Sequence, residues 1–245
     1  CDIALGHAKD QDSYTPNTVL FHVSTVRDAL QSVFRGRERN LGDWGFGVTV
    51  STGGGTASTD SIKLPVDQTT PSTVNIKIQG KATATGTKQF KLDFGDGNST
   101  IGTVVAGVLT SFPHTYIIPG QYNIKATAIT AGALEEFDVL QIDNCKLFGT
   151  ITIPATVQFS GIQVPNNLVT RVLMQPACYA FLVSFILYNN NMDTSSVNEN
   201  LIGLDNSGLL NGIAHFGGGT NNAPTGLGIA AKNSLIAKGW TVITN

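Results

Sequence analysis

Two aspartates are the side chains of this sequence whose type and spacing come nearest to a metal site. Asp93 and Asp96 flank Phe94-Gly95. Carboxylate oxygens are the hard ligands that Ca²⁺ prefers, so this pair could contribute to a calcium site. Two carboxylates are too few ligands for such a site, and a turn explains them equally well. We therefore expect no bound metal.

The histidines and the glycine-rich segments form no catalytic pattern. None of the four histidines belongs to an H-E-x-x-H pair or has another candidate ligand at helical spacing. Gly53-Gly54-Gly55-Thr56 and Gly217-Gly218-Gly219-Thr220 look like phosphate-binding loops, but neither is followed by the lysine that a P-loop requires. The sequence also has no G-x-S-x-G nucleophile elbow. We expect a protein that is not an enzyme and has no cofactor.

Composition favours turn-rich β structure with an uncharged polar surface. Charged residues make up 13% of the 245 residues, and glycine occurs 27 times. A soluble domain has about 25% charged residues, so this value is low. The net charge of −2 gives no electrostatic reason to expect nucleic acid or an anionic membrane as a partner. The longest apolar run, 179–187, is too short to cross a bilayer, so no membrane span is expected.

The three cysteines, Cys1, Cys145 and Cys178, lack the spacing of a zinc site. Cys145 and Cys178 could pair, although two separate buried thiols are the simpler expectation. Cys1 allows two interpretations: the lipid-bearing first residue of a mature lipoprotein, or a cytoplasmic start from which the initiator methionine was removed.

These residues need elements to position them, and the first 65 residues predict a small β-α-β unit. A strand over 19–23 leads to a helix that begins at Thr25, its N-cap, and ends at Gly36. A second strand follows over 44–50, and the Gly/Ser/Thr-rich stretch 51–61 reads as a linker. We interpret 1–65 as a docking or assembly unit.

The candidate docking residues of this unit are arginines and aromatic side chains: Arg27, Arg35, Arg37, Arg39, Trp44 and Phe46. The arginines fall at and just after the end of the predicted helix, where the helix dipole favours cations. A solvated helix end is the simpler explanation, and a patch for an acidic partner is the alternative. The two aromatic residues alternate with small ones, which favours a core role over a role as interface anchors.

Residues 66–143 predict a β-sandwich. Apolar residues alternate over 74–78, 90–94 and 121–128, and another strand follows over 137–142. Asp96-Gly97 and Pro119-Gly120 have the residue types of tight turns. The strand-turn-strand order gives several short strands at the spacing of an immunoglobulin-like fold.

Three motifs in this segment resemble the signature of the PKD domain, an immunoglobulin-like sandwich: D-F-G-D-G, H-T-Y and P-G-x-Y. They comprise Asp93, Phe94, Gly95, Asp96, Gly97, His114, Thr115, Tyr116, Pro119, Gly120 and Tyr122. The resemblance implies that these residues are structural, with His114 packed and hydrogen-bonded at a strand corner. It also implies a spacer or binding module.

Residues 144–245 predict an α/β unit. Leu182, Phe185, Leu187 and Asn190 fit the pattern L-x-x-L-x-L-x-x-N, in which the asparagine amide bonds to backbone groups as the chain leaves a short parallel strand. A helix over 194–204, a strand over 213–216, a second helix ending at Gly239 and a last strand follow.

This C-terminal segment resembles the terminal leucine-rich-like repeats and cap of bacterial surface proteins and phage structural proteins. Only one repeat is clear in the sequence, over 182–190. A free-standing solenoid normally needs at least about three repeats, so a full horseshoe is not expected. The fold class is therefore mainly β with α/β flanks: 1–65 β-α-β, 66–143 PKD-like sandwich, 144–245 repeat-like cap unit.

This organisation favours a non-enzymatic structural and display protein of a bacteriophage virion, as a capsid decoration, fibre-base or tail protein. Its expected partners are other copies of itself or capsid and tail proteins, with a host-surface glycan or protein as a further target. The alternatives are a bacterial cell-surface lipoprotein or adhesin, and an accessory binding module of a secreted enzyme.

Overall fold

The computed structural model describes residues 61–70 and 72–245, which are mainly β, as expected from the sequence. The predicted β-α-β unit lies outside the described residues apart from its last five positions. Six candidate docking residues lie outside them as well: Arg27, Arg35, Arg37, Arg39, Trp44 and Phe46.

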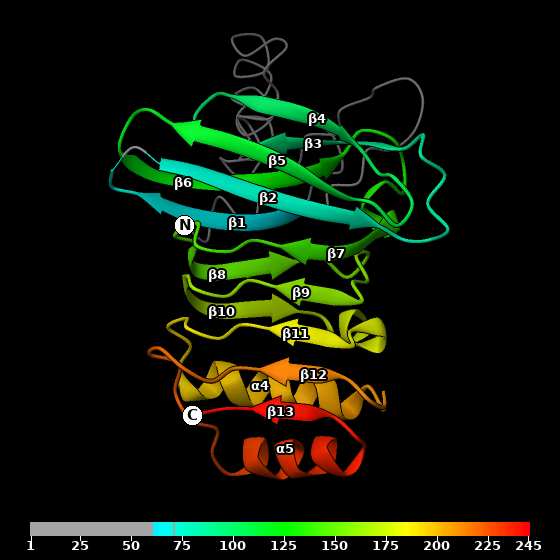
Figure 1. The fold of residues 1–245 in the computed structure, drawn as a ribbon, viewed down its shortest axis with the longest axis vertical. Coiled ribbons are helices and arrows are strands. Elements are labelled where there is room, and N and C mark those ends of the chain that lie inside the picture. Colours follow the sequence, from blue (N-terminus) through cyan, green and yellow to red (C-terminus); the bar gives the residue numbers. More distant parts are fainter. Residues whose placement is uncertain (1–60, 71) are drawn as a thin grey trace, which may run out of the picture. The chain divides into compact units, whose positions relative to one another are not determined.

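Antiparallel strands build the first half of the described chain (Figure 1). These are β1 (Ser61–Gln68), β2 (Ser72–Gly80), β3 (Gln89–Asp93), β4 (Ser99–Thr103), β5 (Leu109–Tyr116) and β6 (Gly120–Ala128). In β2, Val74, Ile76 and Ile78 are buried and their neighbours are partly exposed. This period of two places every second side chain in the space between the sheets.

From β7 onward the chain winds into stacked coils. A short 3-10 turn, η1 (Leu134–Glu136), leads into the elements β7 (Phe137–Gln141), β8 (Phe148–Ile153), β9 (Gly161–Gln163), β10 (Leu168–Met174), η2 (Pro176–Phe181), β11 (Ser184–Ile186), α4 (Thr194–Asn206), β12 (Ile213–His215), α5 (Leu227–Ala237) and β13 (Thr241–Ile243). Each coil contributes one short strand to a parallel array, in the order β7, β9, β11, β12, β13. The backs of the coils are β8 and β10 first, and then α4 and α5 (Figure 1).

Both sheets continue from the sandwich into the coils. Within the described residues, one sheet has the order β10-β8-β1-β6-β3-β4 and the other the order β13-β12-β11-β9-β7-β2-β5. The predicted boundary at 143/144 is therefore crossed by both sheets, and the boundary at 65/66 falls inside β1. The pairing of β8 with β1 and of β9 with β7 joins the two segments that the sequence separates.

The coils also begin earlier than the sequence pattern indicates. The repeat motif over 182–190 covers only the coil of β11, whereas the parallel array starts at β7. The coil of β9 has the same spacing as the motif, with Phe159, Ile162, Val164 and Asn167 at the positions of Leu182, Phe185, Leu187 and Asn190, and the sequence analysis does not single it out. The parallel array therefore extends on both sides of the segment that the motif covers.

The hydrophobic core is shared by the sandwich and the coils. Phe90 of β3 packs edge-on against Phe137 of β7, with ring centroids 4.9 Å apart. Phe137 in turn lies 6.3 Å from Phe159, which precedes β9. All three side chains are buried. This aromatic contact path makes the start of the coil stack part of the sandwich interior.

Residues at the helix ends explain the limits of α4 and α5. Asp193 caps α4, since its Oδ1 accepts a hydrogen bond from the Ser196 amide at 2.7 Å. Val197, Leu201 and Leu204 then face the core, as their spacing predicts. Gly239, with φ of 84°, follows α5 in a left-handed conformation that terminates the helix. In 61–70 and 72–245, no helix is long and apolar enough to span a membrane.

Candidate functional site

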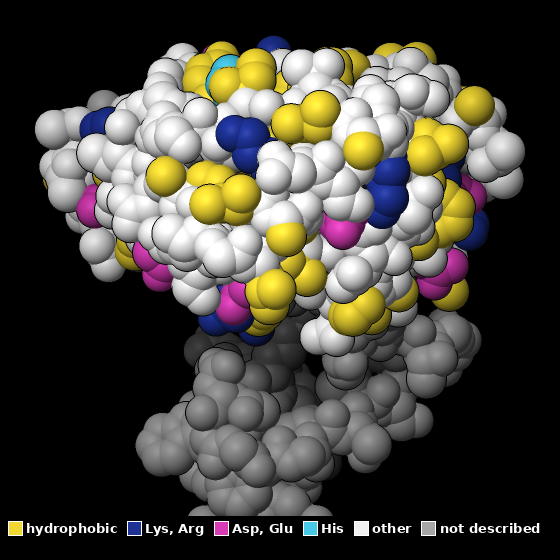
Figure 2. Space-filling model, turned by 90° about the horizontal axis from the view of Figure 1, so that it is seen from below, with side chains coloured by type: hydrophobic (Ala, Val, Ile, Leu, Met, Phe, Trp, Pro, Cys, Tyr) yellow, Lys and Arg dark blue, Asp and Glu magenta, His cyan; other side chains and the backbone are white. Residues whose placement is uncertain are grey.

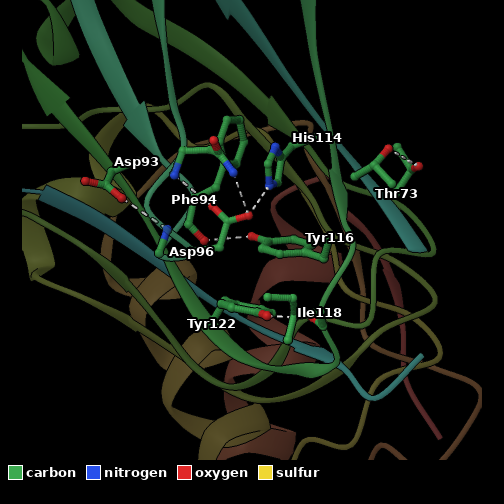
Figure 3. Close-up of polar contacts among 11 residues, drawn as sticks. Thr73, Asp93, Phe94, Asp96, His114, Tyr116, Ile118 and Tyr122 are labelled. Atoms are coloured by element: carbon green, nitrogen blue, oxygen red, sulfur yellow. Dashed lines mark hydrogen bonds and ion pairs between the residues drawn. The ribbon is translucent and has the colours of Figure 1, made fainter. Parts of the chain in front are cut away.

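The first half of the PKD-like signature forms a tight turn after β3 (Figure 3). Asp93 Oδ1 accepts a hydrogen bond from the Gly95 amide, and Asp96 Oδ1 accepts one from the Asn98 amide, both at 3.0 Å. Gly95 has φ of 81°. A Cβ there would lie 2.9 Å from the Asn123 amide nitrogen, so only glycine fits this position.

His114 on β5 locks this turn to the neighbouring sheet. Its Nε2 lies 2.8 Å from Asp96 Oδ2, and its ring stacks on Phe94 with centroids 4.0 Å apart (Figure 3). Tyr116 meets the other side of the imidazole edge-on at 4.6 Å. The imidazole therefore has a carboxylate partner and two aromatic partners, and it joins segments from different sheets.

Two tyrosines extend the cluster toward β6. Tyr116 is fully buried and donates its hydroxyl to the Phe94 carbonyl at 2.8 Å. Tyr122 stacks on Tyr116 at 4.4 Å and donates to the Ile118 carbonyl at 2.6 Å. Burial, with a smaller contribution from the Asp96 carboxylate, raises the pKa of Tyr116. Its hydroxyl therefore keeps the proton that the bond to Phe94 requires.

The rest of the signature completes the strand pairing. Thr115 lies opposite Thr73, with their hydroxyl oxygens 2.8 Å apart. Pro119 precedes Gly120, the first residue of β6. A Cβ at Gly120 would come within 3.2 Å of the Tyr122 ring, so a small residue favours the aromatic stack.

The carboxylate oxygens of Asp93 and Asp96 all contact partners within the protein. Asp93 Oδ2 contacts Lys91 Nζ at 3.4 Å, and Asp96 Oδ2 accepts from Asn98 Nδ2 at 3.1 Å as well as facing His114. Together with the amide bonds to their Oδ1 atoms, each carboxylate oxygen has a partner. Across 61–70 and 72–245, no group of three or more His, Cys, Asp or Glu side chains is arranged to hold a metal.

The electrostatics of Asp96 predict a pH-dependent contribution to stability. Burial alone would raise the pKa of Asp96, but the hydrogen bonds from Asn98 and the contact with His114 outweigh it and lower the pKa below the ordinary 3.8. A carboxyl whose pKa is lower in the folded state stabilises the fold above its unfolded pKa. That contribution is lost as the pH falls through the folded-state pKa.

We therefore expect Asp96→Asn to lower the free energy of unfolding by about 1–2 kcal/mol near neutral pH, because the charge-assisted bonds weaken. Below pH 3.8 the difference between wild type and variant should shrink, since wild-type Asp96 is then increasingly protonated. Urea unfolding of both proteins over a pH series measures this difference directly. A difference that stays constant through the acid range would contradict the assignment.

The repeat signature occupies the interior of the coil of β11. Leu182, Phe185 and Leu187 are fully buried. Asn190 is 2% exposed, and its Nδ2 donates to the carbonyls of Val164 at 2.7 Å and Leu187 at 3.0 Å. The asparagine amide thus bonds to backbone groups of two successive coils, in the manner that the motif predicts.

Two further asparagines, which the sequence analysis does not single out, repeat this arrangement. Asn167 donates to the Ile142 carbonyl at 3.1 Å and accepts from the Cys145 and Leu147 amides. Asn221 donates to the Leu187 and Phe216 carbonyls, both at 2.8 Å. Asn167, Asn190 and Asn221 form a buried ladder along the coils. Each stands a few residues after a front strand, which is the signal in the sequence that could have located them.

A groove beside β10 is a second site that the sequence does not indicate. It has a volume of about 580 Å³ and runs between Arg171–Met174 of β10, η2 and α4. Arg171 Nη2 pairs with Glu199 Oε2 across it at 2.8 Å. The next coil bonds to the backbone of β10 only at Val169, whose carbonyl accepts from the Asn191 amide and whose amide donates to Asn190 Oδ1, before it turns into α4. The rear of this coil is a helix, whereas the rear of each earlier coil is a β-strand, and this change leaves an open space beside the edge strand β10.

Cys145, Cys178 and His215 are the remaining cysteine and histidine side chains of the described residues. Cys145 and Cys178 are both buried and unpaired, which confirms the expectation of two separate thiols. Burial raises the pKa of each thiol. His215 lies in β12 with its ring 4.8 Å from that of Tyr188, and burial lowers its pKa.

No protein-family model, curated protein or solved structure matches this chain. The geometry above is therefore the basis for assigning a class of protein.

Proposed function

We propose that this chain is a non-enzymatic structural protein that holds binding surfaces away from an assembly to which it is attached. In this proposal, 66–143 is a PKD-like sandwich and 144–245 is a leucine-rich-repeat-like unit. The two units form one continuous body rather than separate domains joined by a linker.

The aromatic and ionic cluster supports the PKD-like part of the proposal. Its polar groups bond to one another or to backbone: Asp96 to His114, Tyr116 to Phe94 and Tyr122 to Ile118. A catalytic group needs a reachable partner for the substrate and a proton to exchange. Side chains that are already paired and packed, as these are, stabilise a strand corner.

The ladder of buried asparagines supports the leucine-rich-repeat-like part. Repeats of this class bury apolar residues along one short parallel strand per coil and turn out of it at an asparagine. The coils of β9, β11 and β12 have this arrangement through Asn167, Asn190 and Asn221. The first coils have a β-strand at the rear and the later coils have a helix, so this unit differs from a uniform repeat array.

The observation that carries the proposal is the continuity of both sheets from β1–β6 into the coils. Two separate modules would be joined by a flexible linker and would move independently. Here the shared hydrogen bonds and the shared core fix their separation and orientation. Such a body suits a spacer that presents a surface at a set distance, whereas catalysis does not require it.

We place this protein on a bacteriophage virion, as a capsid decoration, fibre-base or tail component. Residues 1–65, with their clustered arginines, would dock to capsid or tail proteins. The sandwich and coils would then project toward a host-surface glycan or protein. A bacterial cell-surface lipoprotein or adhesin is the alternative, and an accessory binding module of a secreted enzyme is a third candidate.

Fractionation of a culture that makes the chain tests this placement. Lysate is separated on a density gradient into DNA-containing particles, envelope and soluble protein, and the chain is followed with an antibody against 61–245. The proposal expects the chain in the particle fraction, with an intact mass that shows no lipid adduct. Recovery in the envelope with a diacylglycerol adduct would overturn the virion proposal and support the lipoprotein.

A further inference from the structure

The groove beside β10 contains an edge of this strand that pairs with no other strand of the described residues. β10 is the last strand of the six-stranded sheet, and β8 occupies its other edge. This open edge lies inside the chain, because β10 is followed by η2, β11 and α4. Strand edges are usually shortened, twisted away or covered, since their unpaired N–H and C=O groups attract another strand. Here α4 stands beside the edge, but a space of about 580 Å³ remains between them.

The burial pattern of β10 shows which backbone groups point to this edge. Val169, Val172 and Met174 are its buried residues. Between the first two, the register against β8 shifts by one residue, so all three share one orientation. The Val169 amide donates to Asn190 Oδ1 at 3.0 Å, so the backbone groups in this orientation point away from β8. The N–H and C=O groups of Val172 and Met174 therefore face the groove, which both residues line.

One face of α4 forms the opposite wall of the groove. The residues of α4 that line it follow one another at the spacing of a single helix face: Glu199, Ile202, Gly203 and Asn206. Tyr179 of η2 holds this wall in place. Its hydroxyl donates to Asn200 Oδ1 at 3.0 Å, and a Cβ at Gly203 would lie 2.5 Å from its ring, so the ring and the helix are in close contact. The groove is therefore already formed in the absence of a partner.

The lining of the groove has no net charge. Its two charged side chains, Arg171 and Glu199, pair with each other at 2.8 Å. The other lining residues are uncharged, and most of them are apolar, such as Leu173, Ala180 and Ile202. A charged group that entered the groove would lose its hydration without gaining an ionic partner. The chemistry of the groove therefore matches an uncharged segment that brings its own backbone donors and acceptors.

Scattered hydrophobic side chains elsewhere on the surface do not form a comparable site. On the face that Figure 2 shows, hydrophobic side chains lie in several separate groups, with polar side chains and backbone between them. Isolated apolar residues of this kind are normal on a protein surface and do not indicate a partner. The groove beside β10 differs from them because it combines a hollow with an unpaired strand edge.

We propose that this groove binds an extended, uncharged segment of a partner protein, which adds to β10 as a further strand of the six-stranded sheet. Backbone hydrogen bonds to Val172 and Met174 align the segment. Every second side chain of the segment enters the groove, and the others face the solvent. At about 3.3 Å per residue, about four residues of the segment lie along 171–174. This peptide site is independent of the proposed virion location.

Selection from a displayed library of random short peptides on the full chain tests the proposal. Peptides enriched on wild type should contain few charged residues. They should bind the variant Ala180→Arg at least about 10-fold more weakly in calorimetric titration, because the long cationic side chain fills the groove. Ala180 is exposed, so this variant should fold. Ala131→Arg, at an exposed turn position outside the groove, is the matched control and should bind the peptides as wild type does.

Backbone pairing has its own test. Alternate residues of a strand direct their N–H groups to opposite edges, so only every second N–H of the bound peptide meets β10. N-methylation of a selected peptide at one set of alternate residues should therefore abolish binding, and methylation of the other set should have little effect. Hydrogen exchange of the Val172 amide should slow when the unmethylated peptide binds.

Three results would each overturn the proposal. The first is a selection that enriches no peptide on wild type over Ala180→Arg. The second is an equal effect of methylation on both sets of residues, or an unchanged exchange rate at Val172, because the peptide then does not pair with β10. The third is self-association of wild type that Ala180→Arg abolishes, which would place a second copy of the chain in the groove.

Discussion

Replacement of Asn190 by alanine is expected to lower the free energy of unfolding by about 3–5 kcal/mol, measured by urea denaturation. The side chain is 2% exposed, so water cannot replace what it provides. Its amide donates to the carbonyls of Val164 and Leu187, and its Oδ1 accepts from the Val169 amide at 3.0 Å. The variant leaves these backbone groups buried without partners.

Asn191→Ala is the matched control for this prediction. Asn191 is the next residue, has the same side chain and is exposed, and it bonds to the neighbouring coil only through its backbone amide. Its replacement should change the free energy of unfolding by less than about 0.5 kcal/mol. Equal effects of the two variants would show that the ladder does not hold the coils together.

Replacement of Tyr116 by alanine is the second change with a large expected effect, a loss of about 3–5 kcal/mol in the free energy of unfolding. The ring is fully buried between His114 and Tyr122, so its removal leaves a cavity at the sandwich corner. The Phe94 carbonyl also loses its hydrogen-bond donor.

Two comparisons separate these contributions. Tyr116→Phe keeps the ring and removes only the hydroxyl, so it should cost about 1–2 kcal/mol. Tyr188→Ala removes a partly exposed tyrosine from the coil region and should cost less than Tyr116→Ala. If Tyr116→Phe were as destabilising as Tyr116→Ala, packing of the ring would not be the main source of stability.

Local patterns in the sequence predict most of the elements. The alternation over 74–78 predicts β2, and the helix expected over 194–204 is α4 with two more residues. The helix stop at Gly239 is also correct. These features depend on side-chain periodicity and on backbone conformations that few residue types adopt, and both can be read within a short window.

The relations between distant segments could not be predicted in this way. The pairing of β8 with β1 depends on residues far apart in the chain, and the short strands of the coils have only three residues at β9, β11 and β12. Asn167 follows Phe159, Ile162 and Val164 at the spacing of the repeat motif, so the sequence could have located it. Asn221 lies farther from its strand than the motif allows, and it becomes recognisable only when the coils are stacked, because it bonds to the Leu187 carbonyl of the neighbouring coil. The groove beside β10 could not be predicted for the same reason. It forms where the rear of the coil changes from a β-strand, in the coils of β8 and β10, to the helix α4.

Because each coil adds one strand to the parallel array, the length of the coil stack changes in fixed steps. Neighbouring strands of a sheet are about 4.8 Å apart, so each added or deleted coil would move the C-terminal end by that step. The antiparallel strands β1–β6 would not have to change, because only β7 and β8 of the coils pair with them. Chains of this design could therefore differ in the length of the coil stack by whole coils while the antiparallel strands stay the same.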